Sequence, residues 1–233
     1  MGSPTVATAV VTASLLVLTG ASGGGPPLPA RMADTGGGTQ LITAVAARSG
    51  STTGTVTWWD RREGRWVKAG SVRARFGAGG LVEGAAREQG TNTTPTGLYH
   101  LPFAFGIKAA PDGTSYPYRP VRAHSWWCQD NDSRSYNRWS EPRAADCRAA
   151  EAEHLVTYPK QYAYALVIGF NYSRPVRGRG AGIFLHVNGA GATAGCVSVS
   201  AGAMRRILDW AEPDAEPHIA IGTTSGRTAI TRY

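Results

Sequence analysis

Residues 183–197, which read IFLHVNGAGATAGCV, constrain the fold of this chain more than any other segment. Aliphatic residues occupy every second position from 183 to 187, a period-two pattern that predicts a short strand from which His186 projects. A loop of small residues then separates His186 from Cys196. An imidazole and a thiol at opposite ends of one short loop are the layout of a cysteine nucleophile and its base.

The residue before the cysteine favours the same interpretation. Gly195 has no Cβ, so the backbone can approach a ligand closely, and the amides of Gly195 and Cys196 are candidates for an oxyanion hole. Such a site would catalyse acyl transfer. The alternative is structural, because a free cysteine is often buried as a small apolar side chain, and His186 would then be an ordinary core histidine.

The chain contains three cysteines, an odd number. Cys128 and Cys147 lie in one polar, aromatic-rich segment with the character of a surface loop, so they are predicted to form a disulfide in an oxidising compartment. Cys196 is then left with a free thiol, as a nucleophile requires.

The first residues indicate export. Residues 6–18 are rich in Ala, Val, Leu and Thr and precede Thr-Gly-Ala, which is similar to a signal peptide with a small-residue cleavage site. We predict a signal peptide over residues 1–21, a Gly/Pro-rich disordered spacer over 22–38 and one catalytic domain over 39–233. The expected location is secreted or extracytoplasmic, in the cell envelope.

The formal net charge is +8, carried by arginines spread along the chain, including the pairs Arg61-Arg62 and Arg205-Arg206. Attraction to an anionic polymer and a simple solvated basic face both fit this charge. No nucleic-acid recognition motif accompanies it, and the export signal argues against a nucleic-acid partner. None of the five histidines has the spacing of a metal motif such as HExxH, so no metal is expected.

Strand signals outnumber helix signals, so the domain is predicted to be mainly β. The predicted strands are residues 41–46, 55–59, 65–68, 72–76, 97–101, 163–170, 182–187 and 219–221. Charge and glycine in residues 60–64 predict a hairpin. The clearest helix begins after Ser200, a candidate N-cap, carries apolar residues at helical spacing and stops before Pro213.

Three segments, in chain order, are similar to motifs of one family. Residues 94–97 (TPTG) resemble its TPxG motif, residues 183–186 resemble its histidine strand, and residues 193–197 (TAGCV) resemble its (S/T)xGC nucleophile loop. Over about residues 39–222 the chain therefore resembles the YkuD-type L,D-transpeptidase catalytic domain, and residues 125–139 resemble an exported actinobacterial branch of it. The resemblance implies a YkuD-type β-sandwich or barrel-like domain with a helix after the catalytic cysteine.

The resemblance also implies a cysteine acyltransferase that acts on peptidoglycan stem peptides. His186 would activate the Cys196 thiol, which would attack the carbonyl that follows a D-configured diamino acid centre, release D-alanine and form a thioester. An amine from a second stem would then give a cross-link, whereas water would give carboxypeptidase action. The family implies no metal and no organic cofactor, and carbapenem-type inhibitors that mimic the stem are expected to acylate the thiol.

Two positions depart from the commonest pattern of the family. Ala194 stands where a histidine usually precedes the Gly-Cys pair, and Ser198 stands where asparagine or arginine usually follows the cysteine. These departures concern how substrate is anchored and leave the nucleophile and base in place. The candidate substrate-binding residues are Thr193, Asn188, Ser198 and His124.

Residues 124–147 are unusually dense in aromatic rings, with Trp126, Trp127, Tyr136 and Trp139. One interpretation is a lid whose rings line a groove for the stem peptide. The other is a disulfide-stapled surface loop whose rings cover one end of the core. Both remain open at this point.

Two other functional classes fit the sequence. One is a cell-wall Cys-His peptidase or carboxypeptidase with water as its acceptor, although papain-like enzymes place the cysteine before the histidine and the sortase motif TLxTC is not in the chain. The other is a non-catalytic peptidoglycan-binding relic of the fold, in which Ala194 and Ser198 mark a decayed site. Thiol reactivity separates these classes, because a relic has no need of an activated cysteine.

Overall fold

The structure, a computed structural model, describes residues 1–2 and 25–224. The predicted signal peptide therefore lies, apart from its first two residues, outside the described part of the chain. Within the described part, no helix has the length and apolar character needed to cross a bilayer.

Strands dominate the described residues, which confirms the mainly β fold class. The strands are β1 (Gln40–Ala46), β2 (Thr53–Arg62), β3 (Arg65–Arg75), β4 (Leu81–Glu83), β5 (Thr94–His100), β6 (Ala104–Gly106), β7 (Tyr118–Pro120), β8 (Trp126–Cys128), β9 (Arg138–Ser140), β10 (Ala152–His154), β11 (Ala165–Val167), β12 (Phe184–Val187), β13 (Val197–Val199) and β14 (His218–Thr223). The helices are α1 (Ala201–Trp210) and the short 3₁₀ turns η1 (Leu28–Arg31), η2 (Gly84–Ala86), η3 (Ala149–Glu151), η4 (Leu155–Thr157), η5 (Gln161–Ala163) and η6 (Pro213–Ala215).

Most strands belong to one sheet, with the order β4-β5-β14-β1-β2-β3-β13-β12-β11-β6-β7. Apart from the short edge strand β4, the first half of this sheet is built from longer strands, and the second half carries the short strands around the predicted histidine and cysteine. Strands β12 and β13 are parallel neighbours, with Leu185 beside Val197 and His186 beside Ser198. This pairing brings the two ends of the small-residue loop side by side.

The hairpin predicted at residues 60–64 is confirmed. Strands β2 and β3 pair antiparallel down to Arg62 and Arg65, and Glu63 and Gly64 turn the chain with positive φ angles of 49° and 76°. The two strands predicted over 65–68 and 72–76 form one continuous strand, β3. Pairing with β2 runs through this strand from Arg65 to Arg75, and position 70 must be glycine because a Cβ there would lie 2.0 Å from Cζ2 of Trp58.

The helix predicted after Ser200 is confirmed as α1. The Ser200 side chain caps it by accepting a hydrogen bond from the Ala203 amide at 3.3 Å. Its buried residues share the main hydrophobic core with residues of β1, β2, β12 and β13, so the helix packs directly behind the strand that follows the cysteine. The buried residues are Ala203, Met204, Ile207 and Leu208.

Part of the segment predicted to be a disordered spacer has a described structure. Residues 28–31 form η1, whose Pro29 is buried, and Leu28 and Met32 pack against Leu41 and Ala220 of the sheet. Two apolar side chains in an otherwise Gly/Pro-rich segment therefore tie it to the domain, which composition alone does not indicate.

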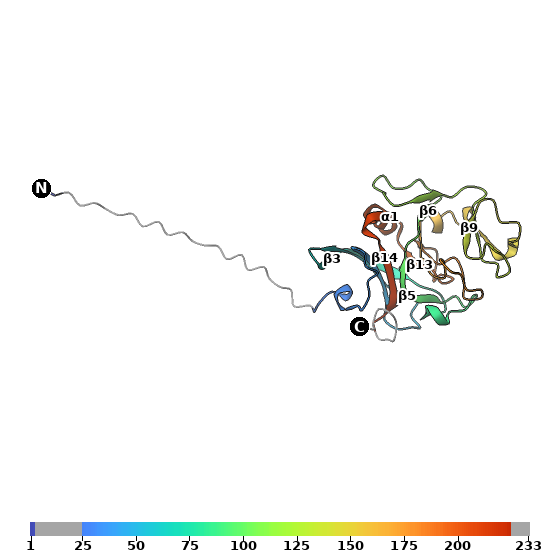
Figure 1. The fold of residues 1–233 in the computed structure, drawn as a ribbon, viewed down its shortest axis with the longest axis horizontal. Coiled ribbons are helices and arrows are strands. Elements are labelled where there is room, and N and C mark those ends of the chain that lie inside the picture. The colour runs from blue at the N-terminus through green and yellow to red at the C-terminus, as the bar shows by residue number, and fades with distance from the viewer. Residues whose placement is uncertain (3–24, 225–233) are drawn as a thin grey trace.

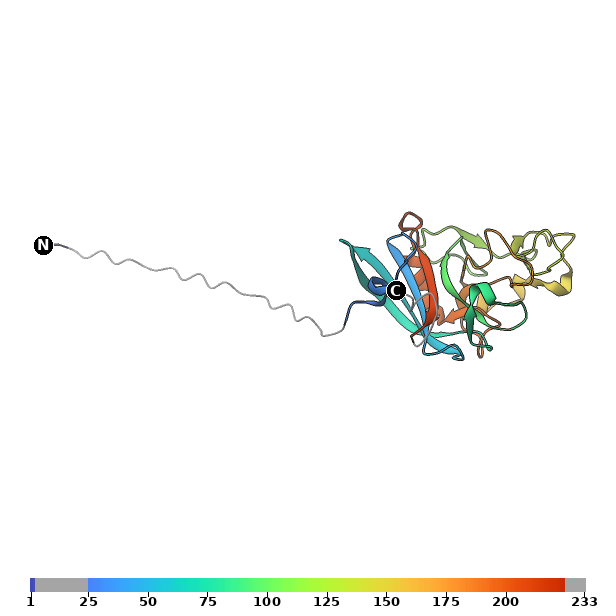
Figure 2. The same cartoon turned by 60° about the horizontal axis from the view of Figure 1, so that its bottom comes forward.

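A small sheet, β10-β8-β9, lies at the opposite end of the molecule from the β2–β3 hairpin (Figures 1 and 2). Its aromatic rings pack into a second hydrophobic cluster: Trp127 meets Phe184 at 4.8 Å between ring centroids, and Trp139 meets Phe105 at 5.6 Å. Trp126 stacks on His154 at 4.0 Å. The rings cover one end of the core, as the second interpretation of residues 124–147 expected.

The disulfide between Cys128 and Cys147 is formed, and Cys196 is free. We expect the Cys128→Ser/Cys147→Ser variant to lose about 3 kcal/mol of unfolding free energy, because the bond closes a loop of 19 residues and removes chain entropy from the unfolded state. Urea unfolding of the variant and of the oxidised wild type measures this loss. Thiol titration of the denatured, unreduced wild type should find one thiol; three thiols would contradict the prediction.

Candidate active site

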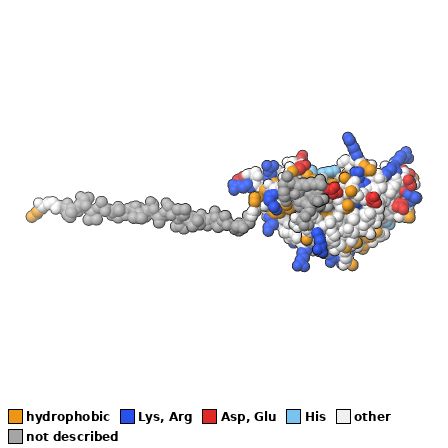
Figure 3. All heavy atoms as spheres, turned by 90° about the horizontal axis from the view of Figure 1, so that it is seen from below, with side chains coloured by type: hydrophobic (Ala, Val, Ile, Leu, Met, Phe, Trp, Pro, Cys, Tyr) orange, Lys and Arg blue, Asp and Glu red, His pale blue; other side chains and the backbone are white. Residues whose placement is uncertain are grey.

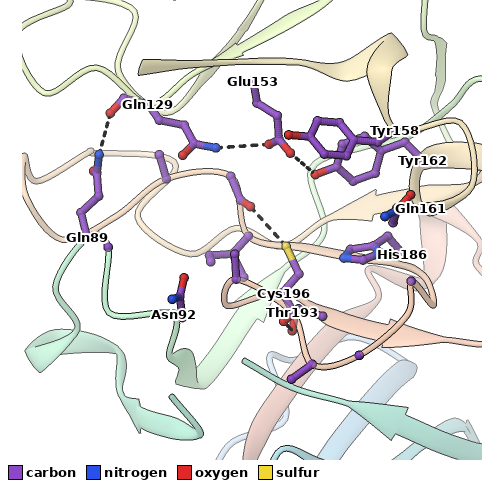
Figure 4. Close-up of a pocket in the computed structure, with 18 of the residues that line it drawn as sticks. Gln89, Asn92, Gln129, Glu153, Tyr158, Gln161, Tyr162, His186, Thr193 and Cys196 are labelled. Atoms are coloured by element: carbon purple, nitrogen blue, oxygen red, sulfur yellow. Dashed lines mark hydrogen bonds between the residues drawn. The ribbon is translucent and has the colours of Figure 1, made fainter. Parts of the chain in front are cut away.

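A pocket of about 470 Å³ opens where β12, the small-residue loop and the small sheet meet (Figure 4). Both His186 and Cys196 line it, together with side chains from three other parts of the chain. The polar lining residues are Arg87, Gln89, Asn92, Gln129, Glu153, Tyr158, Gln161, Tyr162, His186, Thr193 and Cys196.

His186 lies on β12 and is buried, with 6% of its surface exposed. Its Nδ1 is 2.8 Å from the carbonyl of Val187. A carbonyl only accepts, so Nδ1 carries the proton and Nε2 keeps its lone pair. Burial lowers the pKa of His186 to about 4, so the ring is neutral at neutral pH and Nε2 can accept a proton.

Cys196 directly precedes β13 and sits beside Phe184 of β12. Its Sγ accepts a hydrogen bond from the Phe184 amide and donates one to the Gly182 carbonyl, each at 3.4 Å. Burial raises the pKa of this thiol to about 12, the Phe184 hydrogen bond and Arg87 lower it, and Glu153 raises it further. At neutral pH, therefore, the pocket holds a neutral thiol and a neutral imidazole.

The loop before Cys196 is held by two threonine hydroxyls. Thr193 Oγ1 accepts from the Gly195 amide at 3.1 Å and donates to the Cys196 carbonyl at 2.6 Å. Thr94 Oγ1, in the TPTG segment of β5, lies 3.4 Å from the same carbonyl and accepts from the Gly77 amide at 2.8 Å. Two motifs that are about a hundred residues apart thus meet at Cys196.

Arg87 places a buried guanidinium beside this loop, with 5% of its surface exposed. Nε donates to the Thr93 carbonyl at 2.8 Å and Nη1 to the Arg179 carbonyl at 2.9 Å. A Cβ on Gly195 would lie 2.9 Å from Nη2, so the third nitrogen faces the Gly-Cys step. Burial lowers the pKa of Arg87 and the neighbouring Cys196 raises it, so this cation favours the thiolate form of Cys196.

A carboxyl group faces the pocket from the small sheet (Figure 4). Glu153 Oε1 accepts from the Tyr162 hydroxyl at 2.6 Å, and Oε2 accepts from Gln129 Nε2 at 3.2 Å. The Tyr162 ring packs edge-on against His186, with 5.6 Å between the ring centroids. Burial raises the pKa of Glu153 to about 7, while its two hydrogen bonds lower it.

Of the residues predicted from the sequence, the structure brings Cys196, His186 and Thr193 together in the pocket, with Gly195 between them in the loop. The other three substrate-binding candidates do not line it. Ser198 is fully buried and donates to Asn188 Oδ1 at 2.8 Å. His124 is exposed on the turn before β8.

Sequence reasoning missed Arg87, Glu153 and Tyr162. Each belongs to a segment without a motif, and each reaches the pocket from a different element. In the sequence, Glu153 is a polar residue within a short strand, β10. Such residues are common on protein surfaces, so this pattern does not identify a site residue. Among the described residues, no three His, Cys, Asp or Glu side chains lie close enough to share a metal ion.

A model of the YkuD family, described as the L,D-transpeptidase catalytic domain, matches residues 52–224. A search of curated proteins finds no significant match. Among solved structures, the chain is similar to the one titled "Structure of Bdellovibrio bacteriovorus Bd1075", with a TM-score of 0.39 and 16% sequence identity over 82% of this chain and 50% of that chain. The chain thus spans half the length of that protein.

Proposed function

Because the chain belongs to the YkuD family of L,D-transpeptidase catalytic domains, we propose that it is a cysteine acyltransferase that acts on peptidoglycan stem peptides through a Cys196 thioester. One observation carries this proposal. A neutral His186 with an unprotonated Nε2 shares a pocket with the free thiol of the chain. A general base and the nucleophile it activates must share a site in this way, and we propose that the thiol, which donates to the Gly182 carbonyl in the structure, turns toward Nε2 when it reacts.

Acylation begins when Nε2 of His186 takes the thiol proton as the sulfur attacks the carbonyl of the donor stem. The C–S bond forms while the carbonyl oxygen gains negative charge, and the C–N bond to the terminal D-alanine then breaks. His186 returns its proton to the departing amine. The product is a thioester on Cys196, which an amine or water can resolve.

Three groups are candidates to stabilise the negative charge that develops on the carbonyl oxygen. The Cys196 amide is the first, and the buried cation of Arg87 lies beside the same loop. The Gly195 amide donates to Thr193 in the empty site, so it joins the oxyanion hole only after that hydrogen bond is exchanged. Arg87 thereby supplies a positive charge beside the Gly-Cys step.

One observation favours the non-catalytic alternative. The pKa of Cys196 is raised to about 12, whereas activated cysteines generally have a lowered one. A neutral thiol still reacts when its proton passes to a base during the attack, which is the role we assign to His186. The acyltransferase and the non-catalytic relic therefore differ in whether the protein turns over a stem peptide.

We propose a secreted, cell-envelope location, consistent with the formed disulfide. Lysine and arginine side chains are scattered over the face seen in Figure 3 and form no single patch there. Weak attraction to anionic cell-wall polymers is the role we propose for this charge.

The test is product analysis with a purified stem tetrapeptide that ends in D-alanine. We expect the wild type to release D-alanine and to form a peptide dimer, which mass spectrometry identifies. Tripeptide without dimer would make the protein a carboxypeptidase. The absence of both products, with the protein folded, would favour the peptidoglycan-binding relic.

A further inference from the structure

The mechanism above leaves the carboxyl group of the pocket, that of Glu153, without a role. Glu153 is half-buried on β10, where it can be reached from the pocket, and its two hydrogen-bond partners, Tyr162 and Gln129, are both neutral. A carboxylate has about four acceptor positions, so capacity for further donors remains. A carboxylate held among neutral groups is costly unless a cation or further donors reach it.

The carboxyl lies very near the nucleophile. A Cβ on Gly182 would be 3.7 Å from Glu153 Oε2, and the carbonyl of the same Gly182 accepts the Cys196 hydrogen bond at 3.4 Å. One residue therefore separates the carboxyl from the thiol, and Glu153 acts electrostatically on both Cys196 and Tyr162. A group bound to Glu153 would sit within reach of an acyl chain on the sulfur.

The surroundings suit a primary ammonium. The walls near Glu153 offer the Tyr158 and Tyr162 hydroxyls and the amides of Gln129 and Gln161, which are neutral groups able to accept hydrogen bonds. An ammonium carries three donors and pairs with one carboxylate. The buried cation of the pocket, Arg87, is already held by two carbonyls and faces Gly195.

Resting on the proposed function, we propose that Glu153 binds the ammonium group of the acyl acceptor and removes its proton, so that the site transfers its acyl group to amines in preference to water. One proton passes from R–NH₃⁺ to the carboxylate, and the nitrogen lone pair of R–NH₂ attacks the thioester carbon. The C–S bond breaks, the sulfur receives a second amine proton through His186, and the amide keeps the third. Glu153 then returns its proton to water.

The raised pKa of Glu153 supports this assignment, because a base that titrates near neutrality can both take and release a proton in each turnover. Its partner Tyr162 stays protonated, because burial raises the pKa of that hydroxyl, and so it continues to donate to the carboxylate. His186 remains the base for acylation, and Glu153 serves only the second half-reaction.

The experiment compares the wild type with Glu153→Gln, using the stem tetrapeptide as both donor and acceptor and quantifying dimer against tripeptide. Glu151→Gln is the matched control, since Glu151 is an exposed residue of the neighbouring turn. We expect Glu153→Gln to lower the dimer-to-tripeptide ratio at least tenfold, whereas Glu151→Gln leaves this ratio at the wild-type value. Glu153→Asp, which keeps the charge, should restore much of the ratio.

An unchanged ratio in Glu153→Gln would overturn the inference, and so would an equal loss of dimer and tripeptide. A wild type that forms neither product and no acyl-enzyme would instead overturn the proposed function. Should the variants not fold, the wild type supplies a second test. Dimer formation must then saturate with acceptor concentration, because the ammonium binds; a linear dependence would contradict an acceptor site.

Discussion

Cys196→Ala loses at least about a thousandfold in acyl transfer, because no other group can form the thioester. The domain stays folded, because the substitution removes one small atom and two long sulfur hydrogen bonds, to the Phe184 amide and the Gly182 carbonyl. We expect the unfolding free energy to change by no more than about 1–2 kcal/mol. The variant thereby separates the chemistry from the fold.

Intact mass spectrometry with and without a carbapenem measures this result. The wild type should gain the mass of one inhibitor molecule, and Cys196→Ala should gain none while still unfolding in one cooperative thermal transition. The disulfide stays intact in both, so Cys128 and Cys147 cannot react in place of Cys196. Turnover by Cys196→Ala at the wild-type rate would refute the mechanism.

His186→Gln lowers the acylation rate by about a hundredfold to ten-thousandfold, the usual contribution of a general base. Cys196 itself is protonated at neutral pH, because burial raises its pKa to about 12, so the thiol depends on a neighbouring base. Glutamine keeps the size and polarity of the side chain but cannot accept the proton. The measurement is the second-order rate constant for acylation by a carbapenem.

The pH dependence of the acylation rate shows how protonation of His186 changes that rate. His186 accepts a proton only when it is neutral, and its pKa is lowered to about 4, so wild-type acylation should rise as the pH increases through 4 and not near 6.5. The profile is best recorded in the Glu153→Gln background, which removes the carboxyl that titrates near neutrality in the same pocket. His186→Gln should lack this acidic limb. A wild-type limb near 6.5 would show that the histidine is solvated and not buried.

The features that sequence reasoning predicted correctly are local ones. Alternating apolar residues predicted strand β12, a charged and glycine-containing turn predicted the β2–β3 hairpin, and Ser200 predicted the start of α1. The Cys128–Cys147 disulfide followed from counting three cysteines. The same local signals predicted two strands, 65–68 and 72–76, where the structure has one. The packing of Trp58 over Gly70 is a contact between strands and is not visible in the local sequence.

The sequence by itself determined the mainly β class and pointed to Cys196 and His186 as the candidate nucleophile and base, because strand periodicity, caps and the TAGC loop are encoded by neighbouring residues. Only the tertiary structure decided what surrounds them. Arg87, Glu153 and Tyr162 come from three separate elements and meet at one pocket, while Asn188 and Ser198, though close to the cysteine in sequence, bond to each other outside it. Which residues meet at the pocket depends on how the strands pair across the sheet. Tertiary packing, and not spacing along the chain, therefore determines which buried polar groups hydrogen-bond to each other.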